Sequence, residues 1–232
     1  MSVEYHITGI LQAALFVLSI SAVYVQLRLV RVRRRAIAQM KTAEVATDNL
    51  SVIAVVGAFA AFFSFLIFST ATVPFAHYIF WSRIPACILA ILLLWEFRRD
   101  HIDGVVPLLG PLAGGLFVSG LVSTALFPGV SRDFIHSLQV LVVSTGVVLV
   151  GGQIHQLWLL LKQRRIGALS LRARTLNVMK DVSTIAFGLT LGVHQSWSLV
   201  AVAGANAAMT ALVIGVGMYI SRDTPRASDS SE

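Results

Sequence analysis

The sequence predicts an all-α integral membrane protein with seven transmembrane helices, and its composition, segment lengths and charge placement all indicate this fold class. Charged residues make up 12% of the 232 residues and apolar types 56%, and the mean hydropathy is +0.81. An ordinary soluble protein has about 25% charged residues, so we exclude a soluble enzyme. The single cysteine, Cys87, excludes an internal disulfide framework and a cysteine-rich zinc site.

Seven stretches of the sequence reach the length of about 20 mostly apolar residues that a membrane helix needs. The breaks between them are short, so no soluble domain is inserted. The first stretch does not have the form of a cleavable signal peptide, because Glu4 stands where a basic region would be and basic residues follow the stretch. The expected spans are residues 7–27, 50–69, 75–97, 105–126, 138–161, 176–193 and 198–220.

The lysines and arginines indicate the orientation, because cytoplasmic loops of membrane proteins carry an excess of them. In a seven-span arrangement, all of the 18 basic residues except Arg83 and Arg132 fall on one side. We therefore expect the N-terminus outside and the C-terminus in the cytoplasm. No aromatic residues alternate with these arginines as a nucleic-acid stacking platform requires. The basic loops are therefore expected to contact anionic lipids and no nucleic acid.

Spans one to three and spans five to seven share a pattern. In each triplet a basic loop follows the first span, a polar segment precedes the second, and an outer turn with His and Trp precedes or begins the third. Span four has no counterpart, and its prolines and glycines suit a closely packed connector. Because span four crosses once, the triplets are parallel repeats about an axis along the membrane normal. The expected units are a first three-helix bundle at 1–97, an inverter helix at 98–130, a second bundle at 131–221 and a disordered cytoplasmic tail at 222–232.

The local sequence resembles the PQ-loop and SWEET (MtN3-like) families. These families place a Pro-Gln pair near the cytoplasmic end of the first helix of each triplet, followed by basic residues and a Leu-Ser. Here Gln156 matches the motif Gln, Lys162 and Arg164 match the basic pair, and residues 169–170 match the Leu-Ser, whereas His155 replaces Pro. The first triplet matches less closely, with Val-Gln in place of Pro-Gln.

The resemblance implies a divergent, bacterial-type family member in the cell (inner) membrane, which moves a small polar solute by alternating access. A sugar, an amino acid and an organic acid all remain open as the solute. The alternative is a membrane receptor or assembly factor on the same fold that translocates nothing. No nucleophile with its base, metal-ligand spacing or phosphate loop is evident in the sequence, so we expect neither an enzyme nor a cofactor. A homo-oligomer is left open.

The proline of the family motif removes a helix hydrogen bond and makes a hinge. Span five lacks it but has Gly151 and Gly152 about one turn earlier, and glycines also soften a helix. We therefore expect span five to bend more than span one. The alternative is that both helices are stiff and transport has been lost.

Polar residues inside the bilayer are costly and suggest function. Gln153 and Gln156 lie three positions apart on one face of span five, and they either hydrogen-bond between helices or contact solute. Asn206 lies near mid-membrane, where an amide suits a hydroxyl-rich or amide-bearing solute and matches a SWEET-family position. His155 is a candidate proton relay or simply a hydrogen-bonded histidine.

The place in span three that matches this asparagine falls at Ser82, flanked by Trp81 and Arg83, so the pocket is expected to differ between the repeats. Arg83 cannot lose its charge. It either snorkels outward or faces a water-filled cavity and binds an anionic group such as a carboxylate. Asp181, beside Lys180, lies about one turn inside span six. The pair either forms a salt bridge at the inner interface, or Asp181 couples transport to a proton.

Overall fold

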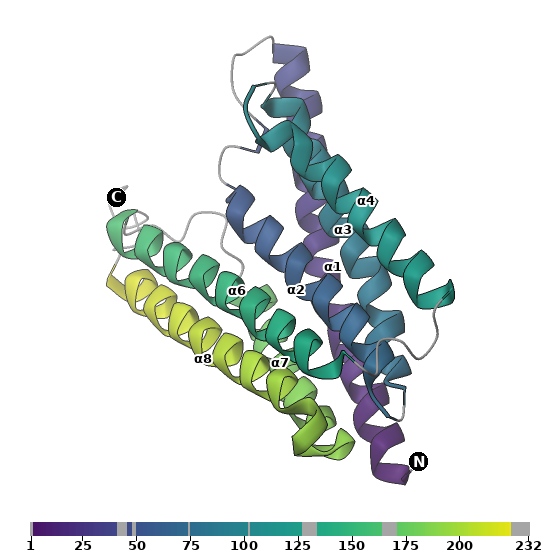
Figure 1. Cartoon of the computed structure of the whole chain (residues 1–232). Helices are drawn as coiled ribbons and strands as arrows, with labels where there is room; N and C mark the ends of the chain where they lie inside the picture. The colour runs from purple at the N-terminus through teal and green to yellow at the C-terminus, as the bar shows by residue number, and fades with distance from the viewer. Residues whose placement is uncertain are drawn as a thin grey trace.

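The computed structural model describes residues 2–40, 46–47, 50–73, 75–101, 103–126, 134–163 and 171–223, apart from the side chains of residues 156, 159, 163, 171–173 and 221–223. All regular structure in these ranges is α-helical, which confirms the all-helical expectation, and each of the seven expected spans falls on one helix (Figure 1). The helices are α1 (Val3–Met40), α2 (Val52–Ala71), α3 (His77–Asp100), α4 (Val106–Leu126), α6 (Ile135–Gln163), α7 (Leu171–Leu191) and α8 (Val193–Asp223).

Three parts of the sequence analysis fall on residues that the structure leaves undescribed. These are Arg132, the loop at 164–170 that holds the end of the PQ-loop-like motif, and residues 224–232 of the expected tail. α8 continues to Asp223, two residues past the start expected for that tail.

Two helix ends show how local sequence sets the boundaries. The Ser51 side chain caps α2 by accepting a hydrogen bond from the backbone N–H of Ala54 at 3.2 Å, which satisfies one of the free amides at a helix start. Gly192 separates α7 from α8 with a φ of +94°. Glycine adopts this left-handed conformation without steric cost, so the chain can reverse direction within one residue.

α1 continues to Met40 instead of ending near residue 27, and a buried carboxylate on α3 holds its extra turns. Glu96 is 1% exposed and accepts hydrogen bonds from Arg31 Nε at 3.0 Å and from Arg34 Nε at 3.1 Å. Arg34 also pairs with Asp100 at 2.6 Å. Because a buried carboxylate without partners is costly, these arginines fix α1 against α3.

α7 differs from the other helices in polarity. The other six helices of the described part are long and apolar enough to cross a membrane, whereas α7 carries Arg174, Lys180 and Asp181. Asp181 and Thr184 are 4% and 3% exposed, so the polar side of α7 faces other helices. α7 begins at Leu171 rather than near residue 176. Lys180 and Asp181 therefore lie midway along the helix, which corrects their expected place near its inner end.

The helix contacts bring the two ends of the chain together. α3 packs against both α1 and α2, and α8 packs against both α6 and α7. α1 also contacts α7, and α2 contacts α6, whereas α4 packs mainly on α3. The start of α1 and the end of α8 lie at opposite ends of the molecule, and α6 and α8 diverge from α1 and α3 toward the end of α8 (Figure 1).

One apolar core cluster joins both halves of the chain toward the start of α1. It includes Tyr5 of α1, Phe65 of α2, Val142 of α6 and Phe187 of α7. On the outside many large apolar side chains are exposed, such as Leu116 of α4 at 50%. An apolar exterior of this extent is typical of a membrane-embedded surface.

Candidate binding site

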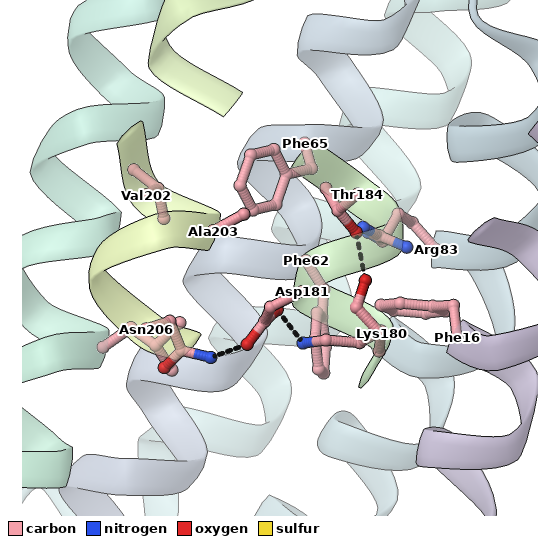
Figure 2. Close-up of a pocket in the computed structure, with 11 residues that line it drawn as sticks. Phe16, Phe62, Phe65, Arg83, Lys180, Asp181, Thr184, Val202, Ala203 and Asn206 are labelled. Atoms are coloured by element: carbon pink, nitrogen blue, oxygen red, sulfur yellow. Dashed lines mark hydrogen bonds and ion pairs between the residues drawn. The ribbon is translucent and has the colours of Figure 1, made fainter. Parts of the chain in front are cut away.

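A small pocket lies in the interior of the assembly, between helices from both halves of the chain (Figure 2). Six helices supply its walls, and α4 contributes none of the lining residues in the described part. Its volume is about 30 Å³, which is room for about two water molecules. A sugar or an amino acid therefore fits only if the surrounding helices move. The lining residues are Phe16, Phe62, Phe65, Arg83, Leu149, Lys180, Asp181, Thr184, Val202, Ala203 and Asn206.

Asp181 organises the polar side of the pocket. Lys180 Nζ lies 2.8 Å from Asp181 Oδ1, and Asn206 Nδ2 donates a hydrogen bond to Asp181 Oδ2 at 2.6 Å (Figure 2). Each carboxylate oxygen thus has a partner, one from α7 itself and one from α8. The salt bridge that the sequence allowed is present, but it lies inside the helix assembly and lines the pocket.

Arg83 of α3 lines the same pocket. Its side chain turns inward and is 2% exposed, so the snorkelling alternative does not describe it. The guanidinium carbon lies 3.5 Å from the centroid of the Phe16 ring, and Nη1 donates to Ser82 Oγ at 3.1 Å. A cation over an aromatic face is attracted by the ring quadrupole, and this offsets part of the cost of burying the charge.

Several polar atoms around the pocket have no hydrogen-bond partner among the described residues. They are Nε of Arg83, Oδ1 of Asn206 and both amide atoms of Gln12, which is fully buried one turn before Phe16 on α1. A buried donor or acceptor without a partner costs about 1–3 kcal/mol. The unpaired atoms of Arg83 and Asn206 belong to residues that line the pocket, so they indicate a place for a polar ligand or ordered water.

Of the residues predicted from the sequence, the structure brings Arg83, Asp181 and Asn206 together at the pocket. Ser82 is 5% exposed and lies beside the pocket as the hydrogen-bond partner of Arg83. The two halves of the chain contribute different chemistry: α3 supplies a cation, whereas α8 supplies an amide that is bonded to a carboxylate of α7.

Trp81 and His155 do not line the described pocket, and their roles as solute and proton sites stay predictions. Trp81 is 65% exposed and its ring contacts Phe80. Two positions along a helix correspond to about 200° of rotation, so Trp81 and Arg83 point to opposite sides. His155 is exposed on α6, and its ring stacks on Trp158 with 5.8 Å between centroids.

The remaining predicted residues lie on α6, away from the described pocket lining. Gln153 accepts a hydrogen bond from Arg174 of α7, which is the interhelical alternative. The side chain of Gln156 is outside the described part of the structure. Gly151 has open space around it, and a Cβ on Gly152 would meet the backbone of α2 at 3.6 Å. Both glycines are therefore free of close steric contact.

Sequence reasoning missed seven residues of the pocket wall: Thr184, three phenylalanines, and the apolar Leu149, Val202 and Ala203. Thr184 could have been found, because it lies three positions after Asp181 and therefore on the same face of α7. The rings of Phe16, Phe62 and Phe65 gave no signal, because phenylalanine is common throughout these apolar spans.

An aromatic cluster lies between the pocket and the N-terminal end of α1. We call it the Tyr5 cluster; it consists of Tyr5, His77, Tyr78 and Phe187. The Tyr5 ring centroid lies 5.2 Å from that of Phe187 and 5.7 Å from those of His77 and Tyr78. Gly9 allows this packing, because a Cβ at that position would collide with the Tyr78 ring. The cluster thus joins α1, α3 and α7.

The arrangement of the helices is similar to that of a solved transporter. The chain superposes on "the 3.7 Å resolution structure of a eukaryotic SWEET transporter" with a TM-score of 0.65, covering 95% of this chain and 98% of that chain at 10% sequence identity. No protein family matches the sequence. No curated protein matches it either. The likeness shows the fold, and together with the apolar helices it identifies a multi-pass membrane protein with a SWEET-like fold.

Proposed function

We propose that this chain is a transporter-like membrane protein that moves a small polar solute by alternating access. The observation that carries the proposal is the buried, charged pocket of Arg83, Lys180 and Asp181 between helices from both halves of the chain. Ionisable residues inside a membrane usually mark a substrate or ion pathway. In transporters built from repeats, the binding site lies near the bilayer midplane at the interface between the repeats.

The proposal treats residues 1–97 and 131–221 as two parallel three-helix bundles and 98–130 as the inverter helix. The contacts support this division, since α3 lies against both α1 and α2 as α8 lies against both α6 and α7. If the two bundles are repeats, α6 corresponds to α1 and α7 corresponds to α2. The α1–α7 contact then corresponds to the α2–α6 contact. Both contacts are present.

In the proposed cycle the Tyr5 cluster is the outer gate, and the bundles separate there when the pocket opens outward. The divergence of α6 and α8 from α1 and α3 toward the opposite end supports a conformation that is closed at the gate (Figure 1). Gly151 and Gly152 are the proposed hinge of α6. Coupling to a proton would pass through Asp181, which must then exchange its bond to Lys180 for a proton.

The setting of the protein is part of the proposal. We place it among the divergent, bacterial-type PQ-loop and SWEET proteins of the inner membrane, as a non-enzyme without cofactors. Its basic loops lie at the cytoplasmic surface against anionic lipids and bind no nucleic acid. A homo-oligomer is compatible with this arrangement.

The orientation predicts that a tag on the N-terminus is labelled by a membrane-impermeant reagent added to intact cells, and that a tag on the C-terminus is labelled only after lysis. The physical reason is the segregation of basic residues, because only Arg83 and Arg132 depart from the cytoplasmic side. Labelling of both ends from the same side would contradict an odd number of membrane crossings.

Transport itself is tested with purified protein in proteoliposomes and labelled glucose, alanine and lactate. We expect uptake of at least one probe. Asn206→Ala should lower that uptake by about tenfold, because an amide hydrogen bond to the solute in the pocket is lost. Gln153→Ala is the matched control, since Gln153 bonds to Arg174 and does not line the pocket. Equal uptake by both variants would remove Asn206 from the solute pathway, and no uptake of any probe by folded protein would contradict transport.

The small volume of the pocket favours a second function, that of a receptor or assembly factor that translocates nothing. A cavity of about 30 Å³ leaves a solute no room while the helices stay in place. This alternative predicts that proteoliposomes accumulate none of the probes, whether or not a probe stabilises the protein against heat. Accumulation that saturates with probe concentration would decide for transport.

A further inference from the structure

The charges in the pocket do not balance. Among the described lining residues Arg83 and Lys180 are cationic and Asp181 is the only anion, which leaves one formal positive charge in excess. All three are largely buried: Arg83 is 2% exposed, and the side chains of Lys180 and Asp181 are 12% and 5% exposed. An uncompensated charge in a low-dielectric interior is strongly unfavourable. The pocket is therefore suited to a ligand with one negative charge.

The unpaired part of Arg83 indicates which kind of anion fits. Phe16 covers a face of the guanidinium at 3.5 Å and Nη1 is bonded to Ser82, whereas Nε has no partner among the described residues. The planar guanidinium offers parallel N–H groups along its edges, and these match the two oxygens of a carboxylate. Because the stacking ring restricts the plane, the edge that carries the unpaired Nε–H is held ready for such a planar group.

Asn206 adds a requirement for a donor on the ligand. Its Nδ2 is used by Asp181, and its Oδ1 is buried without a partner among the described residues. A carbonyl oxygen can only accept hydrogen bonds, so the group that satisfies it must carry an O–H or N–H. A zwitterionic amino acid supplies an N–H donor but has no net charge, whereas a hydroxycarboxylate supplies both the donor and the negative charge.

We propose that this pocket binds a small hydroxycarboxylate, with its carboxylate on Arg83 and its hydroxyl group donating to Asn206. The inference rests on the proposed transport function, since it names the class of solute for the same site. A two-carbon acid exceeds about 30 Å³, so its binding requires the helices around the pocket to separate, as alternating access already demands. The apolar walls from Phe62, Phe65 and Leu149 exclude water and thereby strengthen the charged contact.

The test compares four small probes on the purified full chain by thermal unfolding and by equilibrium binding, at matched ionic strength. Glycolate carries the charge and the hydroxyl, acetate only the charge, glycine the same carboxylate in a neutral zwitterion, and ethylene glycol only hydroxyls. We expect glycolate to stabilise most, acetate less, and glycine and ethylene glycol not at all. This order is measured on the unmodified protein, so it does not depend on any variant folding.

Three variants then locate the contacts. Arg83→Gln should lower the affinity for glycolate and acetate by about ten- to a hundredfold. Arg83→Lys should retain only part of the affinity, because the charge stays but the planar edge is lost. Asn206→Ala should remove the advantage of glycolate over acetate. The matched control is Arg98→Gln, which makes the same charge change at an exposed position of the same helix and should leave binding unchanged.

The proposal would be overturned if glycine or ethylene glycol bound as tightly as glycolate. It would also be overturned if Arg83→Gln left the affinity for glycolate unchanged. Glucose uptake by proteoliposomes without any effect of glycolate would overturn the solute class and leave transport intact. A failure of transport itself would appear differently, as glycolate binding without accumulation of glycolate, glucose, alanine or lactate.

Discussion

Phe187→Ala is expected to lower the free energy of unfolding by about 3–5 kcal/mol and, at the same time, to open the pocket toward the N-terminal end of the molecule. Phe187 is fully buried, and its ring lies 5.2 Å from Tyr5 and 6.1 Å from Tyr78, measured between centroids. Removing the ring leaves a cavity where α7 meets α1 and α3, and a cavity costs free energy beyond the lost apolar burial.

The opening is measured with a single cysteine in the pocket. Ala203 lines the pocket and is 4% exposed, so Ala203→Cys in a Cys87→Ala background reports the access of a maleimide reagent. The parent protein should react slowly and the Phe187→Ala variant markedly faster. The rate in detergent solution and the unfolding midpoint are recorded on the same samples.

Phe97→Ala is the matched control for this prediction. Phe97 is 1% exposed and packs with Leu27, Val30 and Leu93 of α1 and α3, within one half of the chain. It should destabilise the protein by a similar amount without changing the labelling rate. Equal acceleration in both variants would mean that general loosening exposes the pocket, and the Tyr5 cluster would then not be a gate.

Asp181→Asn is expected to destabilise the protein by about 3–5 kcal/mol, the cost of leaving a buried charge without its partner. The substitution keeps the shape of the side chain and an oxygen that can accept from Asn206, so the loss reports the charge and not the hydrogen bond. Lys180 would be left with no anion among the described lining residues of the pocket, which also include Arg83 of the same sign.

A double-mutant cycle with Lys180→Met tests this reason. Removing both partners should restore most of the stability, because neither charge then lies unpaired in the interior. Asp103→Asn is the control at an exposed position and should change stability by no more than about 0.5 kcal/mol. If chemical unfolding finds Asp181→Asn as stable as the parent, the carboxyl group is neutral in the folded protein, which is the condition for carrying a proton.

The apolar stretches by themselves determined where six of the seven described helices lie, though not how far α1 extends beyond its stretch. In a bilayer every backbone N–H and C=O must find a partner within the protein. A stretch of about 20 apolar residues therefore forms a helix, independent of which helices pack against it. Residues such as Arg83 and Asn206 could also be identified from the sequence, because a polar side chain within an apolar span is rare and costly.

Only the tertiary structure decided which of these residues meet. A helix fixes the angle between its own residues, so the opposite directions of Trp81 and Arg83 follow from their spacing once one of them is placed. Which of the two points inward does not follow, because lipid and protein interior are both apolar and no amphipathic pattern marks the inner face. Three contacts join different helices, and they depend on how each helix is rotated against its neighbours. They are the hydrogen bond between Asn206 and Asp181, the stacking of Arg83 on Phe16, and the ion pair between Glu96 and Arg31 of the extended α1.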